Sequence, residues 1–181
     1  MHPSRRNPMI PVAALAILFT AAAPTARAQS PAKLNDPTIV AIFDAANTWD
    51  MESGALAAKR ARSKDVRDFG AMLVKAHRAV RQQGRDLAHK LKVTPTPPKN
   101  FGMAADHAAA MRKLRSLHGS AFDRAFLAHE VAFHKAVIDA VTTTLLPAIQ
   151  NADLKKLVTD VAPAFQAHMM QAQSLLDHYP K

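Results

Sequence analysis

Apolar side chains recur at spacings of three and four residues along most of the chain after residue 36, which is the period of an amphipathic α-helix. Four long stretches keep this period, at about 37–62, 63–91, 121–149 and 153–179. The links after the first and third stretches are so short that each linked pair should form antiparallel neighbours. The pattern therefore predicts a four-helix bundle.

Helix start and stop signals agree with these limits. Asp36–Pro37 combines an expected N-cap with the residue best tolerated at the first helical position, and Ser63 and Asp153 supply later start signals. Pro147 should kink or shorten the third helix, and Pro163 should interrupt the early part of the fourth.

A long connection separates the second and third helices. Residues 93–100 contain three prolines and cannot continue a helix, whereas 103–117 again show apolar residues on one helical face. We therefore expect an extra short helix in this connection. The connection is long enough to cross one end of the bundle or to run along its side, so the second and third helices could be parallel or antiparallel.

Polar side chains interrupt the apolar face of every long helix near its midpoint. In the third helix, Glu130 and His134 share a stripe with Phe126 and Val137. Counting residues from the two short links places the polar groups of each helix pair at nearly the same height, because a helix rises about 1.5 Å per residue. The set that should meet in one layer is Asp50, His77, Glu130, His134 and His168.

A carboxylate facing two or three neutral imidazoles can bind one divalent transition metal, and Zn, Fe, Mn and Cu are all admissible. We expect Asp50, His77, His134 and His168 as ligands, with Glu130 as an alternative ligand or a support behind them. The alternative is a hydrogen-bonded polar layer that fixes helix register without metal. The remaining histidines should be exposed, namely His89, His107, His118, His129 and His178.

A di-iron ferroxidase site is disfavoured. Such sites in ferritin-like bundles use a Glu-x-x-His pair on each of two helices. Here Val74 stands three residues before His77, and Phe165 stands three residues before His168. There is also no phosphate-binding glycine loop, nucleophile elbow or Ser-His-Asp arrangement, so no catalytic set is identified.

The composition of the N-terminal residues indicates the compartment in which the protein works. Arg5 and Arg6 precede an apolar run from Met9 to Ala23, and Ala26–Ala28 form a small-x-small cleavage site. We therefore expect a signal peptide at 1–28, a linker at 29–35, a bundle domain at 36–181 and a periplasmic location. The run is too short to span a membrane, and no later segment approaches spanning length, so the cleaved protein should have no membrane span.

The charge limits which binding partners are expected, and the cysteine content limits which metal sites and cross-links are possible. Residues 1–28 hold three of the 24 Lys and Arg and none of the 14 Asp and Glu, which leaves 21 against 14 and a net charge of +7. These basic residues are dispersed without interleaved aromatics, which favours a solvated helix face and makes nucleic acid an unexpected partner. An anionic envelope surface or a protein partner is the alternative that the positive charge leaves open. The absence of cysteine excludes thiolate metal sites and disulfides.

The chain resembles a bacterial family of exported proteins known as a domain of unknown function with a ferritin-like bundle, often labelled as outer membrane proteins. The resemblance covers nearly the whole chain after the signal peptide and rests on 46–57, 66–77, 122–134 and 162–168. Two positions depart from it, since members usually have an acid where this chain has Ala76, and many have Glu in place of Asp50. The resemblance implies a periplasmic, ferritin-like four-helix bundle and no established activity.

Two hypotheses for function follow. The first is a periplasmic bundle that binds a single divalent transition metal at the mid-bundle layer. The second is a non-catalytic envelope interaction or stress protein, in which the same layer is only structural and the basic surface binds the partner. A mononuclear redox enzyme would also need an open coordination position at the metal.

Overall fold

The computed structural model describes residues 34–99 and 101–179. The predicted signal peptide, residues 1–28, and the first part of the linker lie outside the described residues. Within the described ranges the chain is all-α, without strands, which confirms the predicted fold class. Its helices are α1 (Asp36–Arg60), α2 (Lys64–Lys90), α3 (Gly102–Ser116), α4 (Gly119–Ala140), the π-helix η1 (Val141–Leu145), α5 (Leu146–Ala148) and α6 (Ala152–Asp177).

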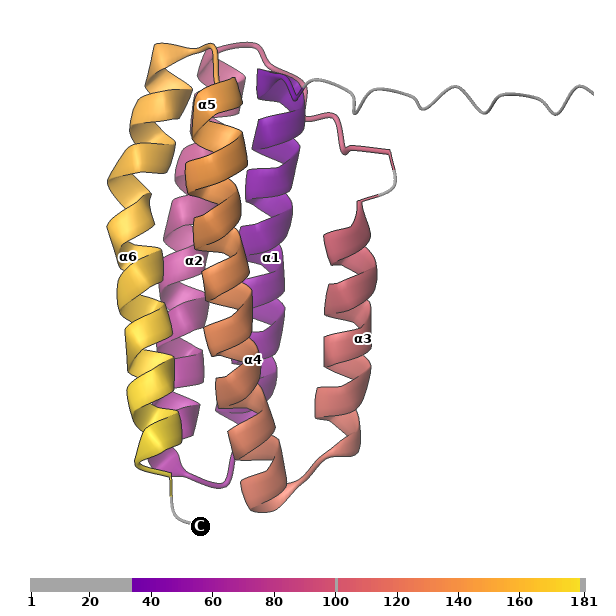
Figure 1. The fold of residues 1–181 in the computed structure, drawn as a ribbon, viewed down its shortest axis with the longest axis vertical. Coiled ribbons are helices and arrows are strands. Elements are labelled where there is room, and N and C mark those ends of the chain that lie inside the picture. Colours follow the sequence, from indigo (N-terminus) through magenta and orange to yellow (C-terminus); the bar gives the residue numbers. More distant parts are fainter. Residues whose placement is uncertain (1–33, 100, 180–181) are drawn as a thin grey trace, which may run out of the picture. The chain divides into compact units, whose positions relative to one another are not determined.

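The bundle consists of α1, α2, α6 and the continuous run α4–η1–α5, and α3 lies along its outside (Figure 1). The long connection returns along the bundle through α3, so α2 and α4 run in the same direction (Figure 1). The pairs that pack most closely are α1 with α2 and α4 with α6, followed by α2 with α6. The closest-packed pairs are therefore antiparallel, and the extra short helix expected in the connection is present as α3.

Hydrogen bonds between distant segments fix this topology at both ends of the bundle. At one end, the Asp36 carboxylate accepts from the backbone N–H groups of Gln150 and Asn151, each at 2.9 Å, which joins the start of α1 to the start of α6. At the other end, the Arg60 guanidinium donates to the carbonyls of Arg115 and Leu117, each at 3.0 Å, and joins the end of α1 to the end of α3.

Three local predictions were wrong. The N-cap of α1 is Asn35, whose side chain accepts from Thr38 N–H at 3.0 Å, so the Asp36 carboxylate is free to bond to the start of α6. Asn151 rather than Asp153 caps α6, accepting from two backbone N–H groups. Pro163 does not interrupt α6, which continues through it.

Near Pro147, the backbone hydrogen bonds of the third long helix change from the α to the π pattern. Its ring cannot accommodate the carbonyl four residues earlier, and the preceding segment adopts the wider π form over Val141–Leu145. Leu146 N–H consequently bonds to Val141 O, five residues back. The helix then ends at Ala148, close to the predicted end.

Two apolar clusters fill the bundle, one on each side of the polar layer. One includes Ile39, Phe43, Val158 and Phe165, and the other includes Phe69, Leu73, Phe122, Phe126 and Leu127. The polar residues occupy the intervening turns of all four helices. This arrangement removes the layer from water while the surrounding apolar side chains hold its height fixed.

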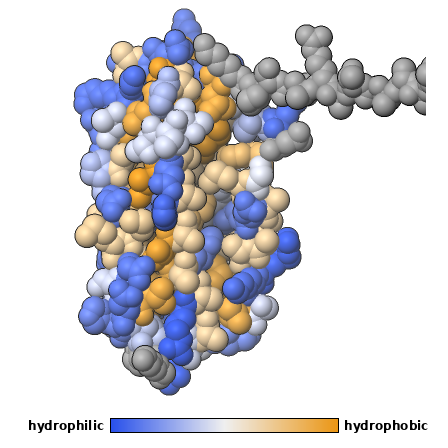
Figure 2. Space-filling view, in the orientation of Figure 1, coloured by the Kyte–Doolittle hydropathy of each residue, from blue (hydrophilic) through white to orange (hydrophobic). Residues whose placement is uncertain are grey.

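Hydrophilic residues alternate with narrow bands of hydrophobic ones on the face shown in Figure 2. Among the described residues, none of the helices combines the length and the apolar character that a membrane crossing requires.

Candidate metal centre

The structure brings together all five side chains that the sequence singles out. α1 contributes Asp50, α2 contributes His77, α4 contributes Glu130 and His134, and α6 contributes His168. Their exposed fractions run from 0% for Glu130 to 8% for His168. Each side chain faces inward because it lies at helical spacing from apolar core residues of its own helix.

The three histidines form a compact triangle of imidazole rings. Ring centres are separated by 5.1 Å for His77 and His168, 5.5 Å for His134 and His168, and 5.6 Å for His77 and His134. Three imidazoles on one tetrahedral ion would place their ring centres about 5 Å apart, given metal–nitrogen bonds of about 2.0–2.1 Å. One nitrogen from each ring lies within 4.8 Å of the other two. The triangle therefore has the size of a three-histidine metal site.

Hydrogen bonds assign which nitrogen of each ring is available. His134 Nδ1 donates to the Glu130 carbonyl at 3.0 Å, which leaves the Nε2 lone pair free. His77 Nδ1 donates to Asn47 Oδ1 at 2.9 Å, because Asn47 Nδ2 donates to the Phe43 carbonyl and so turns its oxygen toward the ring. His77 Nε2 then faces His168 Nδ1 at 3.2 Å. This separation matches two nitrogen ligands on one ion, once His168 carries its proton on Nε2.

Burial keeps the imidazoles neutral at physiological pH. It lowers the pKa of His77 to about 3, helped by the nearby His134 and His168 rings, and lowers the pKa of His134 to about 4. The pKa of His168 is lowered for the same reason. Neutral imidazole is the form that binds metals, so the site needs no deprotonation of these rings near pH 7.

A pair of buried carboxyl groups lies beside the imidazoles. Burial raises the pKa of Glu130 to about 7, and burial together with the nearby Glu130 raises that of Asp50 well above its usual range. One carboxyl oxygen of Asp50 lies within 4.8 Å of one of Glu130, and Ser53 Oγ donates to Glu130 Oε1 at 2.7 Å. Like charges in such proximity disfavour double ionisation, so the pair holds a proton that a cation could replace.

Several polar atoms of the layer have no hydrogen-bond partner although they are buried. These include Asp50 Oδ1, Glu130 Oε2 and His134 Nε2, and Asp50 Oδ1 lies 3.8 Å from His134 Nε2. Unpaired buried polar atoms are costly, typically by about 1–3 kcal/mol each. A shared cation would satisfy them together, because all three are metal-ligand atoms. The donor set is thus one that could hold a metal ion.

Ligand atoms fall into two overlapping groups that share His134. One group is His77, His134 and His168, and the other is Asp50, Glu130 and His134. The first is rich in imidazole and suits Cu or Zn, whereas the second adds the carboxylate oxygens that harder cations prefer.

The sequence reasoning missed two residues that orient this layer and misplaced two histidines. Asn47 and Ser53 are both 1% exposed and hold His77 and Glu130 in place, and their helical spacing from Asp50 was the available signal. His107 was expected to be exposed but is buried, with Nε2 at 2.9 Å from Glu52 Oε2 and its ring stacked on Trp49. His129, also expected to be exposed, is half-buried against α3. The covering helix α3 explains both errors.

The fold and the layer define a class of protein: a helical bundle with a buried cluster of histidine and carboxylate side chains able to hold a metal ion. Residues 21–175 match the family described as "Domain of unknown function (DUF4142)", and the chain belongs to this family. No curated protein sequence matches it.

The structure is also similar to that of CopM, solved in the Cu(II)-bound form. The TM-score is 0.62 at 12% sequence identity, and the match covers 81% of this chain and 100% of CopM. At this identity the likeness shows a shared helical fold.

Proposed function

We propose that this protein binds one divalent transition metal in the periplasm, through His77, His134 and His168 with Asp50 as the adjoining carboxylate ligand. Glu130 supports the site by holding a proton beside Asp50, since burial raises its pKa to about 7, and by accepting a hydrogen bond from Ser53. Cu(II) is the first candidate, since three imidazoles and a carboxylate suit it and the similarly folded CopM was solved with Cu(II) bound.

The observation that carries the proposal is the set of buried atoms without partners. In a purely structural layer, Asp50 Oδ1 and His134 Nε2 would be expected to have hydrogen-bond partners. Instead they face each other at 3.8 Å, beside two further imidazoles held neutral by burial. The periplasmic location is supported by the signal-peptide pattern of residues 1–28.

The test is metal analysis of the mature chain, purified without an affinity tag or a chelator. We expect one ion per chain, and a rise in melting temperature when Cu(II) is added to metal-free protein. At a free-ion concentration of about 100 times the Kd, binding adds about 2.7 kcal/mol to the free energy of unfolding. Zn, Fe and Mn are titrated in parallel to rank the metals.

Exposed histidines bind copper weakly, so the site variant needs a matched control. His77→Gln with His168→Gln should abolish the stoichiometric ion, whereas His89→Gln with His178→Gln changes two exposed histidines and should retain it. If the protein and its control variant carry no metal and none of the four ions raises the melting temperature, the proposal is wrong. The layer would then serve only to fix the register of the helices, and the basic surface would become the leading functional feature.

A further inference from the structure

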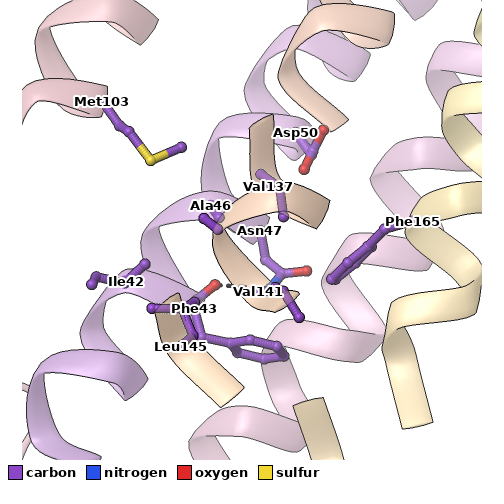
Figure 3. A pocket seen from close by; sticks show the side chains of 11 residues that line it. Ile42, Phe43, Ala46, Asn47, Asp50, Met103, Val137, Val141, Leu145 and Phe165 are labelled. Carbon is purple, nitrogen blue, oxygen red and sulfur yellow. Dashed lines mark hydrogen bonds between the residues drawn. The ribbon is translucent and has the colours of Figure 1, made fainter. Parts of the chain in front are cut away.

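A small cavity adjoins the carboxylate side of the polar layer. It lies between α1, the α4–η1 run, α6 and the start of α3, and Figure 3 shows the side chains around it. Its inner wall is made of buried residues, namely Phe43, Asn47, Asp50, Val141, Leu145 and Phe165. Its outer rim is made of half-buried residues, namely Ile42, Ala46, Met103, Val137 and Ala140. The cavity therefore leads from the surface beside α3 toward Asp50.

The shape of the cavity depends on two features that the metal layer does not require. The π-helix η1 supplies Val141 and Leu145 to the inner wall, and such a widened turn often marks a functional position in a helix. The α3 helix supplies Met103 to the rim, on the far side of Ala46 from Asp50 (Figure 3).

The chemistry of the walls restricts what the cavity can hold. Only Asn47 and Asp50 among the lining residues are polar, and both polar atoms of the Asn47 amide already have partners in Phe43 and His77. Asp50 Oδ1 has none. A charged solute would lose its hydration against apolar walls without compensation. The cavity volume is about 30 Å³, and a water needs roughly 10–15 Å³ of the same measure.

We propose that this cavity is a binding site for one small uncharged molecule, of one or two non-hydrogen atoms, which comes to rest against Asp50 at the edge of the metal layer. Water and diatomic gases have this chemistry. The inference rests on the proposed metal site for its functional meaning, because it gives the bound ion a position open to an outside ligand. The cavity itself can be tested without any metal.

The first experiment uses xenon, an uncharged probe that enters small apolar cavities. Metal-free protein under xenon pressure should show saturable NMR shifts of the Ile42, Val137, Val141 and Leu145 methyl groups. Ala46→Leu places a larger side chain at the rim and should remove these shifts. Ala55→Leu makes the same change at an exposed position of α1 and should leave them unchanged.

A wild-type protein whose lining methyls do not shift would overturn the proposal, and so would Ala46→Leu shifts equal to those of wild type. Should Ala46→Leu fail to fold, the wild-type titration still decides the question. Neither outcome bears on metal stoichiometry, which is measured separately.

The second experiment tests whether the cavity opens onto the ion. In Cu(II)-loaded protein, the relaxation rate of water protons reports a water molecule that exchanges at the metal. Wild type and Ala55→Leu should show this enhancement, and Ala46→Leu should lose most of it while keeping its copper. Equal enhancement in all three chains at equal copper content would refute the link between cavity and metal, and absence of copper from all three would instead count against the proposed function.

Discussion

The contact between α1 and α2 at Gly54 and Gly70 offers the sharpest test of how the bundle is held together. A Cβ atom added at Gly70 would lie 2.6 Å from the Gly54 carbonyl oxygen, 2.9 Å from Ala57 Cβ and 2.9 Å from Ala58 N. Normal non-bonded separations between carbon atoms are about 3.5–4.0 Å. Two of the three obstacles are backbone atoms, so α1 and α2 must move apart.

The expected magnitude follows from two opposing effects. Replacing Gly by Ala within a helix gains roughly 1 kcal/mol of helix propensity. Overpacking typically costs about 1–3 kcal/mol, and the rigid neighbours place Gly70→Ala at the upper end. We therefore expect a net loss of about 2 kcal/mol, which lowers the melting temperature by roughly 4–8 °C for a domain of this size.

Urea unfolding followed by circular dichroism measures this loss, and Gly102→Ala is the control. A Cβ atom at Gly102 meets nothing within 4 Å, so this variant should equal or slightly exceed wild type in stability. Gly54→Ala should also destabilise, since its Cβ would lie 2.7 Å from the Gly70 carbonyl oxygen. Because both changes strain one contact, the double variant should lose less than the sum of the two single losses.

The same strain should reach the metal layer. Asp50 lies one turn before Gly54 on α1, and His77 lies two turns after Gly70 on α2. Separation of the helices would draw these side chains apart, so Gly70→Ala should also weaken metal binding. Gly70→Ala with wild-type stability would refute the reasoning about the close helix approach.

Three further predictions concern single side chains of the bundle. Asp123→Ala removes a buried carboxylate that accepts from Arg62 N, Ser63 N and the Tyr179 hydroxyl at 2.7–2.9 Å. Urea unfolding should show a loss of about 3 kcal/mol in the free energy of unfolding for Asp123→Ala, and of about 1 kcal/mol for Tyr179→Phe, which removes one of these bonds. Equal losses in the two variants would contradict this prediction. Asn47→Ala frees the His77 ring and should weaken metal affinity roughly 10- to 100-fold in a competition titration while the metal stoichiometry stays at one, and unchanged affinity would remove its orienting role. The folded-state pKa of His77, about 3, lies below its unfolded value of 6.5, so acid favours the unfolded chain and stability from this ring falls below pH 6.5. Between pH 7 and pH 5, His77→Gln should therefore lose about 2 kcal/mol less stability than wild type. Asp50 and Glu130 contribute in the opposite direction, but both proteins contain them, so their contributions largely cancel in the comparison. Parallel pH profiles of the two proteins would show that the His77 ring titrates normally in the fold.

The sequence alone determined the helices and the height of the polar layer. Apolar spacing of three and four residues fixes the inward face of each helix, and a constant rise per residue fixes how far each polar residue stands from its link. These two local rules were enough to place Asp50, His77, Glu130, His134 and His168 in one layer. They also limited each helix end to within a few residues of its observed position.

Only the tertiary structure decided the direction of the third helix, the cover provided by α3 and the chemistry of individual atoms. A proline-rich connection has no period, so its path and the burial of His107 beneath α3 could not be read from spacing. Which imidazole nitrogen is free depends on partners such as Asn47 and the Glu130 carbonyl, and the cavity beside Asp50 depends on the π-helix ahead of Pro147. Such features arise from contacts between residues distant in sequence, for which a single amino-acid sequence contains no local signal.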